Sequence, residues 1–401
     1  MSKHEPLEPL SPDYLDADLF GYQGVLTDDE AAIVLKVRQF LNTEVAPRAN
    51  EFWEKAESPV HLLPKIADLG ITGLGYRFDD RDPARKVLTG WLSLEFSRVD
   101  PSTSTMFSVH SGLAMSSISI LGSEEQRNRW LPAMRRMEKI GAFGLSEPHG
   151  GSDVSGGLET TARLDGDHWV LNGSKRWIGN ATFADLIVVF AKDESDGEVK
   201  GFVVEKEFDG FRAEKMEGKY SLRAVENADV YFEDCRVPIA NKLENANAFS
   251  DTAKVLRLTR GGVAWESVGV MIGAYERAVA YAREREQFGR PLASFQLIAD
   301  LLARMAGNIT ACLGMALRVA QLQDDGVNYD EHAALAKTYC TTRLREVVAW
   351  ARELVGGNGI LIEHDVIRYF TDAEALYSYE GTSQINNLIV GRGVTGYSAF
   401  V

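Results

Sequence analysis

Residues 160–171, TTARLDGDHWVL, place the polar step Asp165-Gly166-Asp167 between two runs of strand-forming residues. An Asp-Gly step flanked by such runs is typical of a β-hairpin. Short β-branched or aromatic runs follow at 186–190, 201–205 and 228–232, separated by Gly and Asp. Because no helical pattern intervenes, parallel βαβ units are disfavoured. We therefore expect a small antiparallel barrel or sandwich between about residues 141 and 246.

Helical patterns flank this β-domain on both sides. On its N-terminal side, 27–30 and 123–126 have capping-box sequences, and helical periodicity continues through 62–69, 88–99 and 111–121. On its C-terminal side the same periodicity covers 258–285, 294–324, 332–355 and 365–377, which is typical of an antiparallel bundle. The sequence predicts a mostly α protein with a central β-domain, divided into an N-terminal extension (1–26), a helical domain (27–140), a β-barrel domain (141–246) and a C-terminal helical bundle (247–401).

Composition excludes several classes of function. The 401 residues carry a net charge of −15, spread along the chain, whereas nucleic-acid binding needs a concentrated basic face. The three cysteines, Cys235, Cys312 and Cys340, form no C-x-x-C pair, and no H-E-x-x-H sequence occurs, so we expect no metal site. Residues 1–18 lack an apolar signal region, and no run approaches the roughly 20 apolar residues of a membrane span. A cytoplasmic protein that binds neither nucleic acid nor membrane is expected.

The segment 379–385, YEGTSQI, carries the first chemical signal. A glycine directly after Glu380 allows a ligand to approach the backbone beside a carboxylate. Alone, a carboxylate before Gly-Thr is more often a solvated helix cap. The sequence also contains no strand–G-x-G-x-x-G–helix unit, so a Rossmann dinucleotide site is disfavoured. Other motifs accompany it in order: GLSEP at 144–148, GGSD at 150–153, KRWIGN at 175–180, REQFG at 285–289, FQ at 295–296 and GGNG at 356–359.

In this order and at this spacing, these segments resemble the acyl-CoA dehydrogenase family over nearly the whole chain. Within it they are most similar to the branch of glutaryl-CoA dehydrogenases and plant short-chain acyl-CoA oxidases. The resemblance implies a fold with an N-terminal helical domain, a β-barrel and a C-terminal four-helix bundle. It also implies FAD as cofactor, an acyl-CoA substrate and a homotetramer. Electrons would pass to an electron-transfer flavoprotein or to O₂.

The resemblance assigns roles to individual residues. Glu380 would be the catalytic base. The cofactor would contact Phe143, Leu145, Ser146, Gly151, Ser152, Trp177, Ile178, Gly179, Thr382 and Gln384. A neighbouring subunit would complete the site with Arg285, Gln296, Gly356 and Gly357, and Phe288 and Glu353 are assigned to cofactor binding as well. Substrate contacts would come from Ser104, Ser152, Arg260, Gly381 and Arg392.

The implied reaction needs a base on one side of the substrate and an electron acceptor on the other. Glu380 would take the α-proton of the thioester while flavin N5 takes the β-hydrogen as hydride, giving the trans-2-enoyl-CoA. The backbone N–H of Glu380 and a ribityl hydroxyl would stabilise the developing enolate. An exposed glutamate is a weak base, so we expect desolvation to raise the pKa of Glu380.

Two departures from the family pattern leave alternatives open. Ser104 stands where glutaryl-CoA dehydrogenases carry an arginine, and serine cannot form a bidentate ion pair with a distal carboxylate. A short unsubstituted acyl-CoA is therefore favoured over oxidative decarboxylation of glutaryl-CoA. Gly179 stands where Ser or Thr is usual, which either opens a path for O₂, as in an oxidase, or is only a turn glycine. A flavin-free helical scaffold is the non-enzyme alternative.

Overall fold

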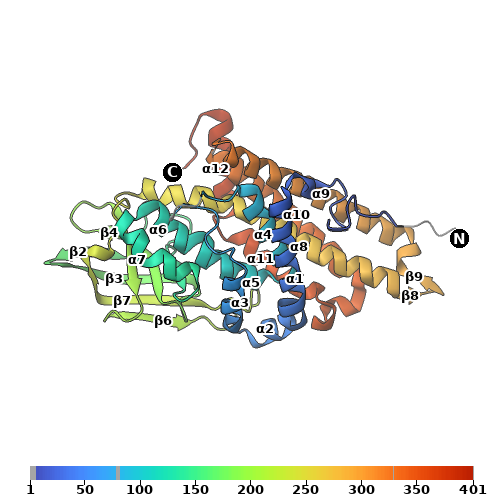
Figure 1. The fold of residues 1–401 in the computed structure, drawn as a ribbon, viewed down its shortest axis with the longest axis horizontal. Coiled ribbons are helices and arrows are strands. Elements are labelled where there is room, and N and C mark those ends of the chain that lie inside the picture. The colour runs from blue at the N-terminus through green and yellow to red at the C-terminus, as the bar shows by residue number, and fades with distance from the viewer. Residues whose placement is uncertain (1–5, 78–81, 328, 401) are drawn as a thin grey trace.

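The three predicted parts occur in the expected order. The computed structural model describes residues 6–77, 82–327 and 329–400. The first five residues of the predicted extension and the last residue of the predicted bundle lie outside the described residues. The β-domain forms one end of an elongated molecule, and the far ends of the long helices form the other (Figure 1). Helices in both flanking parts thus meet the sheet near the middle of the molecule.

The N-terminal helices begin where the capping boxes predict. Thr27 accepts from the backbone of Glu30 and Ser123 accepts from the backbone of Gln126, each with the reciprocal bond. The helix predicted at 111–121 instead begins at 115, after a π-helical stretch over 108–114 that continues the preceding helix. The α-helices are α1 Asp28–Phe40, α2 Ala49–Lys55, α3 Leu63–Asp68, α4 Lys86–Val99, α5 Pro101–Phe107, α6 Met115–Leu121 and α7 Glu124–Arg135.

The β-domain is a curled seven-stranded sheet. Its strands are β1 Gly141–Gly144, β2 Thr161–Asp165, β3 His168–Gly179, β4 Leu186–Asp193, β5 Val199–Glu205, β6 Phe211–Lys215 and β7 Asn227–Pro238. The strand order is β1-β4-β2-β3-β7-β6, with β5 paired to β4. The β2–β3 hairpin is confirmed, with Leu164 opposite Trp169. A purely antiparallel sheet is wrong, because β1 and β2 both pair with β4 in parallel. The chain reverses direction between β2 and β3 and again between β3 and β4, so β4 runs in the direction of β2.

Each face of the sheet has its own core. Side chains of β1, β4 and β5, such as Leu186 and Val188, pack with residues of α6 and α7, including Ile118 and Trp130. The opposite face curls on itself and buries a second cluster around Phe202, Phe232 and their neighbours. Figure 1 shows α6 and α7 lying over the strands. The edge where β1 and β3 end is thereby fixed against the helices.

The C-terminal bundle shares one core with the N-terminal helices. Its elements are α8 Phe249–Glu284, β8 Glu286–Gln287, β9 Arg290–Pro291, α9 Gln296–Asp324, α10 Asp330–Val355, α11 Val366–Ser378 and α12 Ser383–Thr395. Helix α8 packs against α4, α9, α10 and α11 and is the central element. It begins at Phe249 rather than near residue 258, because Asp251 reaches back to the backbone N–H groups of Asn247 and Ala248.

One helix of the described residues, α9, is long and apolar enough in composition to cross a membrane. This differs from the expectation that no segment approaches a membrane span. Small and amide residues interrupt its leucines, so no continuous apolar run is visible in the sequence. Only 22% of its most apolar window is buried inside the chain. Much of the apolar surface of α9 therefore faces outward from this chain.

Candidate active site

A cavity of about 1150 Å³ lies where the β-domain meets the helices. Its walls come from α4, the segment joining α5 to α6, the ends of β1 and β3, the segment 219–227, α8 and the turn between α11 and α12. Small-molecule sites usually span roughly 300–1,000 Å³. The cavity therefore has room for a large cofactor together with a substrate.

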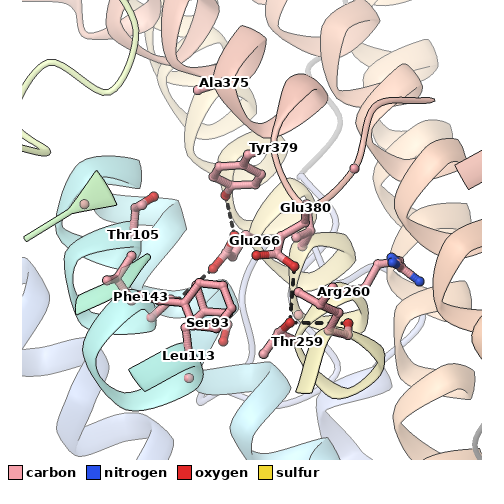
Figure 2. A pocket seen from close by; sticks show the side chains of 18 of the residues that line it. Ser93, Thr105, Leu113, Phe143, Thr259, Arg260, Glu266, Ala375, Tyr379 and Glu380 are labelled. Atoms are coloured by element: carbon pink, nitrogen blue, oxygen red, sulfur yellow. Dashed lines mark hydrogen bonds between the residues drawn. The ribbon is translucent and has the colours of Figure 1, made fainter. Parts of the chain in front are cut away.

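Glu380 lies on the turn between α11 and α12, and its side chain points into the cavity (Figure 2). Its φ of 53° and the φ of 86° at Gly381 are both left-handed, a conformation that is strained for a non-glycine residue. Two buried side chains hold the turn. Nζ of Lys337 and Nδ2 of Asn386 donate to the carbonyl of Gly381 over 2.8 and 2.9 Å. The surrounding contacts thus sustain the strain that aims the carboxylate.

The surroundings of Glu380 make it a stronger base than an exposed glutamate. Burial raises the pKa of Glu380, and Arg260, Thr259 and Lys337 oppose that rise only in part. Thr259 donates a hydrogen bond from Oγ1 to Oε2 of Glu380 over 3.2 Å. Burial also destabilises the charged form of the nearby Lys337 and lowers its pKa to about 8. A carboxylate with a raised pKa accepts a proton more readily near neutral pH.

Trp177 forms part of the β-domain wall of the cavity. It lies at an irregularity in the β3–β7 pairing between Lys175 and Ile178, with a left-handed φ of 68°. Asn227 donates from Nδ2 to the Trp177 carbonyl over 3.0 Å and holds this conformation. The side chain is 56% exposed. The indole therefore presents a large aromatic face to the cavity, which is suited to stacking with a flat ring.

A buried ion pair fixes the neighbouring wall segment. Nζ of Lys175 donates to Glu147 over 2.7 Å, and both side chains are almost fully buried. The same ammonium donates to the Leu145 carbonyl over 3.2 Å. Burial lowers the pKa of Lys175 to about 8. Burial alone would raise the pKa of Glu147, but Lys175 and the N–H of Glu159 outweigh it, so that pKa is lowered. The pair anchors the backbone that leads to Ser146.

Gly179 ends β3 and is not a turn glycine. A Cβ built at this position would lie 3.2 Å from Cγ2 of Val109, closer than ordinary van der Waals contact. A side chain here would require Val109 to shift by a few tenths of an ångström, so close packing is one reason for a glycine at this position.

Many of the predicted contacts do line this one cavity, and its chemistry fits FAD. Nε of Arg260 is buried and has no hydrogen-bond partner among the described residues, so the wall holds an unsatisfied cationic donor. A Cβ at Gly151 would meet no atom within 4 Å, so the backbone there is open to a ligand. The predicted residues on the cavity wall are Phe143, Leu145, Ser146, Gly151, Ser152, Trp177, Ile178, Gly179, Arg260, Glu380, Gly381 and Thr382.

Three of the contacts predicted within this chain do not line the cavity. Ser104 is only 1% exposed, and its Oγ accepts a hydrogen bond from Ser97 over 2.7 Å. Thr105 lines the cavity instead, because adjacent helical residues point about 100° apart. Gln384 is exposed on the first turn of α12, and Arg392 lies near the end of that helix beside Glu331. Ser104, Gln384 and Arg392 therefore do not line the cavity of this chain.

A second group of predicted contacts lies around the far end of α8. Phe288, in the β8–β9 turn, is 93% exposed, and Figure 1 shows this turn at the end opposite the β-domain. Nδ2 of Asn358 donates to the Tyr281 hydroxyl over 3.0 Å and holds the 356–360 turn beside that end. None of the group lines this chain's own cavity. The group comprises Arg285, Phe288, Gln296, Glu353, Gly356 and Gly357.

Sequence reasoning missed Glu266, a second carboxyl in the cavity. It lies on α8, and its two oxygens accept from Ser108 over 2.9 Å and from the Tyr379 hydroxyl over 2.5 Å. Figure 2 shows it beside Glu380, and burial together with the charge of Glu380 raises the pKa of Glu266. A signal was present in the sequence, because a glutamate inside the apolar helical run 263–271 is costly to bury without a role.

Comparisons with known proteins agree with this arrangement. Family models of acyl-CoA dehydrogenases match the N-terminal domain at residues 27–138, the middle domain at 142–235 and the C-terminal domain at 249–395. A short-chain specific acyl-CoA dehydrogenase of Clostridium acetobutylicum is 35% identical over 370 residues, which are 91% of this chain and 97% of that protein. Subunit CarC of the caffeyl-CoA reductase–Etf complex of Acetobacterium woodii is 34% identical over 87% of this chain and 93% of its own.

A solved structure also resembles the whole chain. A glutaryl-CoA dehydrogenase from Mycobacterium smegmatis, in complex with FADH2, superposes with a TM-score of 0.92. Its sequence is 32% identical, and the match covers 96% of this chain and 98% of that one. The fold and its family are thereby established independently of the motifs.

Proposed function

The chain belongs to the acyl-CoA dehydrogenase family, and we propose that it is an FAD-dependent oxidoreductase that desaturates a short-chain acyl-CoA to the trans-2-enoyl-CoA. The observation that carries this proposal is the placement of Glu380. A half-buried carboxylate on a strained, pinned turn shares one cavity with the exposed indole of Trp177. Desaturation needs a base and a flat electron acceptor on the two sides of the acyl chain, and this cavity has walls suited to both.

Glu380 removes the α-proton of the bound thioester. Its raised pKa lets the carboxylate accept that proton near neutral pH, while Thr259 and Arg260 keep a useful fraction of it ionised before reaction. Entry of an acyl chain displaces water from the cavity and strengthens the base further. When bound, FAD supplies the two-electron acceptor for the hydrogen that leaves the β-carbon.

The thioester carbonyl needs a hydrogen-bond donor as negative charge develops on its oxygen. Within the described part of the chain, no protein group accepts a hydrogen bond from the backbone N–H of Glu380. The left-handed φ of Glu380 and Gly381 turns this segment of backbone out of the helical ladder. The Glu380 N–H is thus available as an oxyanion donor beside the base itself.

The relatives and the cavity favour a short acyl chain without a distal carboxylate. The Clostridium relative is named for short-chain substrates, whereas the Mycobacterium neighbour is a glutaryl-CoA dehydrogenase. A distal carboxylate requires a cation, and Ser104 here is both uncharged and turned toward Ser97. We assign a monocarboxylic acyl-CoA on this ground.

Electron-transfer flavoprotein is the acceptor that we propose. One relative is a subunit of a complex with such a protein, and a solved structure 33% identical to this chain is described with the electron-transferring flavoprotein of Acidaminococcus fermentans. The argument for O₂ rested on Gly179, and the close approach of Val109 gives that glycine a packing reason. Oxidase activity is the second candidate and has no further support in the cavity.

A second copy of the chain is needed to complete the cofactor site in this proposal. The predicted contacts around Phe288 and Gly356 lie beside the far end of α8, away from this chain's own cavity. The outward apolar surface of α9 offers an area for self-association. We propose a homo-oligomer, a tetramer by family likeness, in which these residues enter a neighbour's site.

An anaerobic titration tests the proposed function. The purified protein should carry a flavin absorbance band, and butyryl-CoA should bleach it without O₂. Glutaryl-CoA should bleach it far more slowly. Absence of bound flavin, or a band that no acyl-CoA bleaches, would refute the proposal. Hydrogen peroxide formed stoichiometrically on readmitting air would identify an oxidase instead.

A further inference from the structure

Glu266 lines the inner end of the cavity. It follows Thr259 by seven residues on α8, which is about two turns, so both side chains lie on one face of the helix. It is also the last residue of α8 on the cavity wall, because Ser267 and the residues after it are buried in the helical core. Along α8, Thr259 and Arg260 line the cavity beside Glu380, and Glu266 lines it about two turns further on.

Only neutral groups form hydrogen bonds with the Glu266 carboxyl. Its oxygens accept from the hydroxyls of Ser108 and Tyr379, and among the described residues no Lys or Arg forms an ion pair with it. Two other buried carboxylates, by contrast, are paired with cations: Glu147 with Lys175 and Asp100 with Arg368. A carboxylate offers about four acceptor sites. Glu266 therefore presents unused acceptor capacity to the cavity.

The two carboxyls also repel further negative charge. Burial is the main cause of the raised pKa of Glu266, and the nearby charge of Glu380 adds to it. A third carboxylate beside Glu266 would be buried near two acidic groups, and among the described residues no Lys or Arg is paired with Glu266 to compensate. A hydroxyl or ammonium in the same place would instead donate to a waiting acceptor.

We propose that Glu266 determines the acyl specificity of this site, by accepting a hydrogen bond from the distal group of the acyl chain and by excluding chains that end in a carboxylate. The substrate class is thereby a CoA thioester whose acyl end carries a hydrogen-bond donor. This inference rests on the proposed function, because it takes the cavity to be the acyl site.

Three thioesters of equal chain length separate the effects of the end group: pentanoyl-CoA, 5-hydroxypentanoyl-CoA and glutaryl-CoA, which end in methyl, hydroxyl and carboxylate. Their dissociation constants are measured calorimetrically on flavin-loaded protein carrying Glu380→Gln, so that no turnover intervenes. We expect the hydroxyl compound to bind most tightly. Glutaryl-CoA should bind at least about tenfold more weakly than pentanoyl-CoA, because like charges at a buried contact cost several kcal/mol.

Two substitutions then test Glu266 itself. Glu266→Gln should remove most of the penalty against glutaryl-CoA, and Glu266→Met should abolish the preference for the hydroxyl compound. Glu374→Gln is the matched control, because Glu374 lines the exposed rim of the cavity and pairs with Arg345. It should leave all three ratios unchanged.

Equal affinity of the Glu380→Gln protein with native Glu266 for glutaryl-CoA and pentanoyl-CoA would overturn the inference, as would unchanged ratios in both Glu266 variants. If neither Glu266 variant folds, the order of the three affinities measured with native Glu266 still tests the inference. Flavin reduction by pentanoyl-CoA in the wild-type enzyme is scored separately. Its absence would sink the desaturase proposal, while the order of affinities would still report on Glu266.

Discussion

The hydroxyl of Thr259 on α8 donates to Oε2 of Glu380 over 3.2 Å, and it is the one side-chain hydrogen bond to this carboxylate among the described residues. It joins the central helix of the bundle to the strained turn that carries the proposed base. The bond stabilises the charged form of Glu380 against the cost of its burial. It therefore sets both where the carboxylate points and the pH at which it works.

Substitution Thr259→Val should shift the pH dependence of turnover. Loss of the hydrogen bond raises the pKa of Glu380, so less of the base is ionised at a given acidic pH. The acidic limb of kcat/KM should move to higher pH, with a loss of about tenfold at its acidic end and little change on the alkaline plateau. Thr342→Val, which removes a hydroxyl bonded only within α10, is the control. A uniform loss at every pH would mean that Thr259 affects geometry alone.

Substitution Lys175→Met should destabilise the protein and weaken flavin retention. It leaves Glu147 buried without its cation, which costs about 3–5 kcal/mol. The exposed pair of Lys206 and Asp185 gives a matched control, since Lys206→Met should cost at most about 1 kcal/mol. Urea unfolding measures both changes, and flavin absorbance after gel filtration measures retention. Equal costs for the two variants would contradict the role given to the buried pair.

Asp372 should make stability depend on pH. It is fully buried, bonds Trp53 and the backbone of Leu222 at the cavity wall, and burial raises the pKa of Asp372 to about 7. Because the folded-state pKa lies above the unfolded one, this group stabilises the fold at low pH and that contribution is lost as pH rises toward 7. Relative to Asp372→Asn, the wild-type free energy of unfolding should fall by about 1.4 kcal/mol per pH unit between about pH 5 and 7, then level off.

Parallel stability curves for the wild type and Asp372→Asn across this range would contradict the buried-acid account. Thermal unfolding at several pH values measures the difference. The asparagine retains an acceptor for Trp53 and Leu222, so the comparison changes the charge while keeping those bonds.

Arg285→Ala should reduce flavin content without touching this chain's own cavity wall. Arg285 is exposed at the end of α8, away from the cavity, and it reaches a flavin only in a neighbouring copy. Analytical ultracentrifugation should find an oligomer for the wild type, and the variant should release flavin on dilution. A wild-type monomer that holds one flavin per chain would contradict the shared site.

Local sequence signals predicted much of the fold. Capping boxes at Thr27 and Ser123 gave true helix starts, and the Asp165–Asp167 step gave a true hairpin. The parallel pairing of β1 with β4 could not be predicted from the sequence, because strand order depends on contacts between residues distant in sequence. The start of α8 was missed since residues 249–257 lack a clear apolar stripe and depend on capping by Asp251.

The site was predicted best at residues whose short sequence motif goes with an unusual backbone conformation. Glu380 and Trp177 both stand at left-handed positions within short motifs, and both line the cavity. Ser104 was misplaced because one residue of helical rotation separates it from Thr105. Glu266 lay outside every motif, so its one signal in the sequence was a glutamate inside an apolar helical run, and its hydrogen bond from Tyr379 appears only in the structure.

The central claim is that Glu380 is the base that begins desaturation. Glu380→Gln preserves the size of the side chain and can still accept from Thr259, but it cannot take the α-proton. Anaerobic addition of butyryl-CoA to the flavin-loaded variant, followed by absorbance, tests the claim most directly. The account predicts that the thioester binds and perturbs the flavin band while bleaching slows by at least about a thousandfold. Bleaching at the wild-type rate would contradict it.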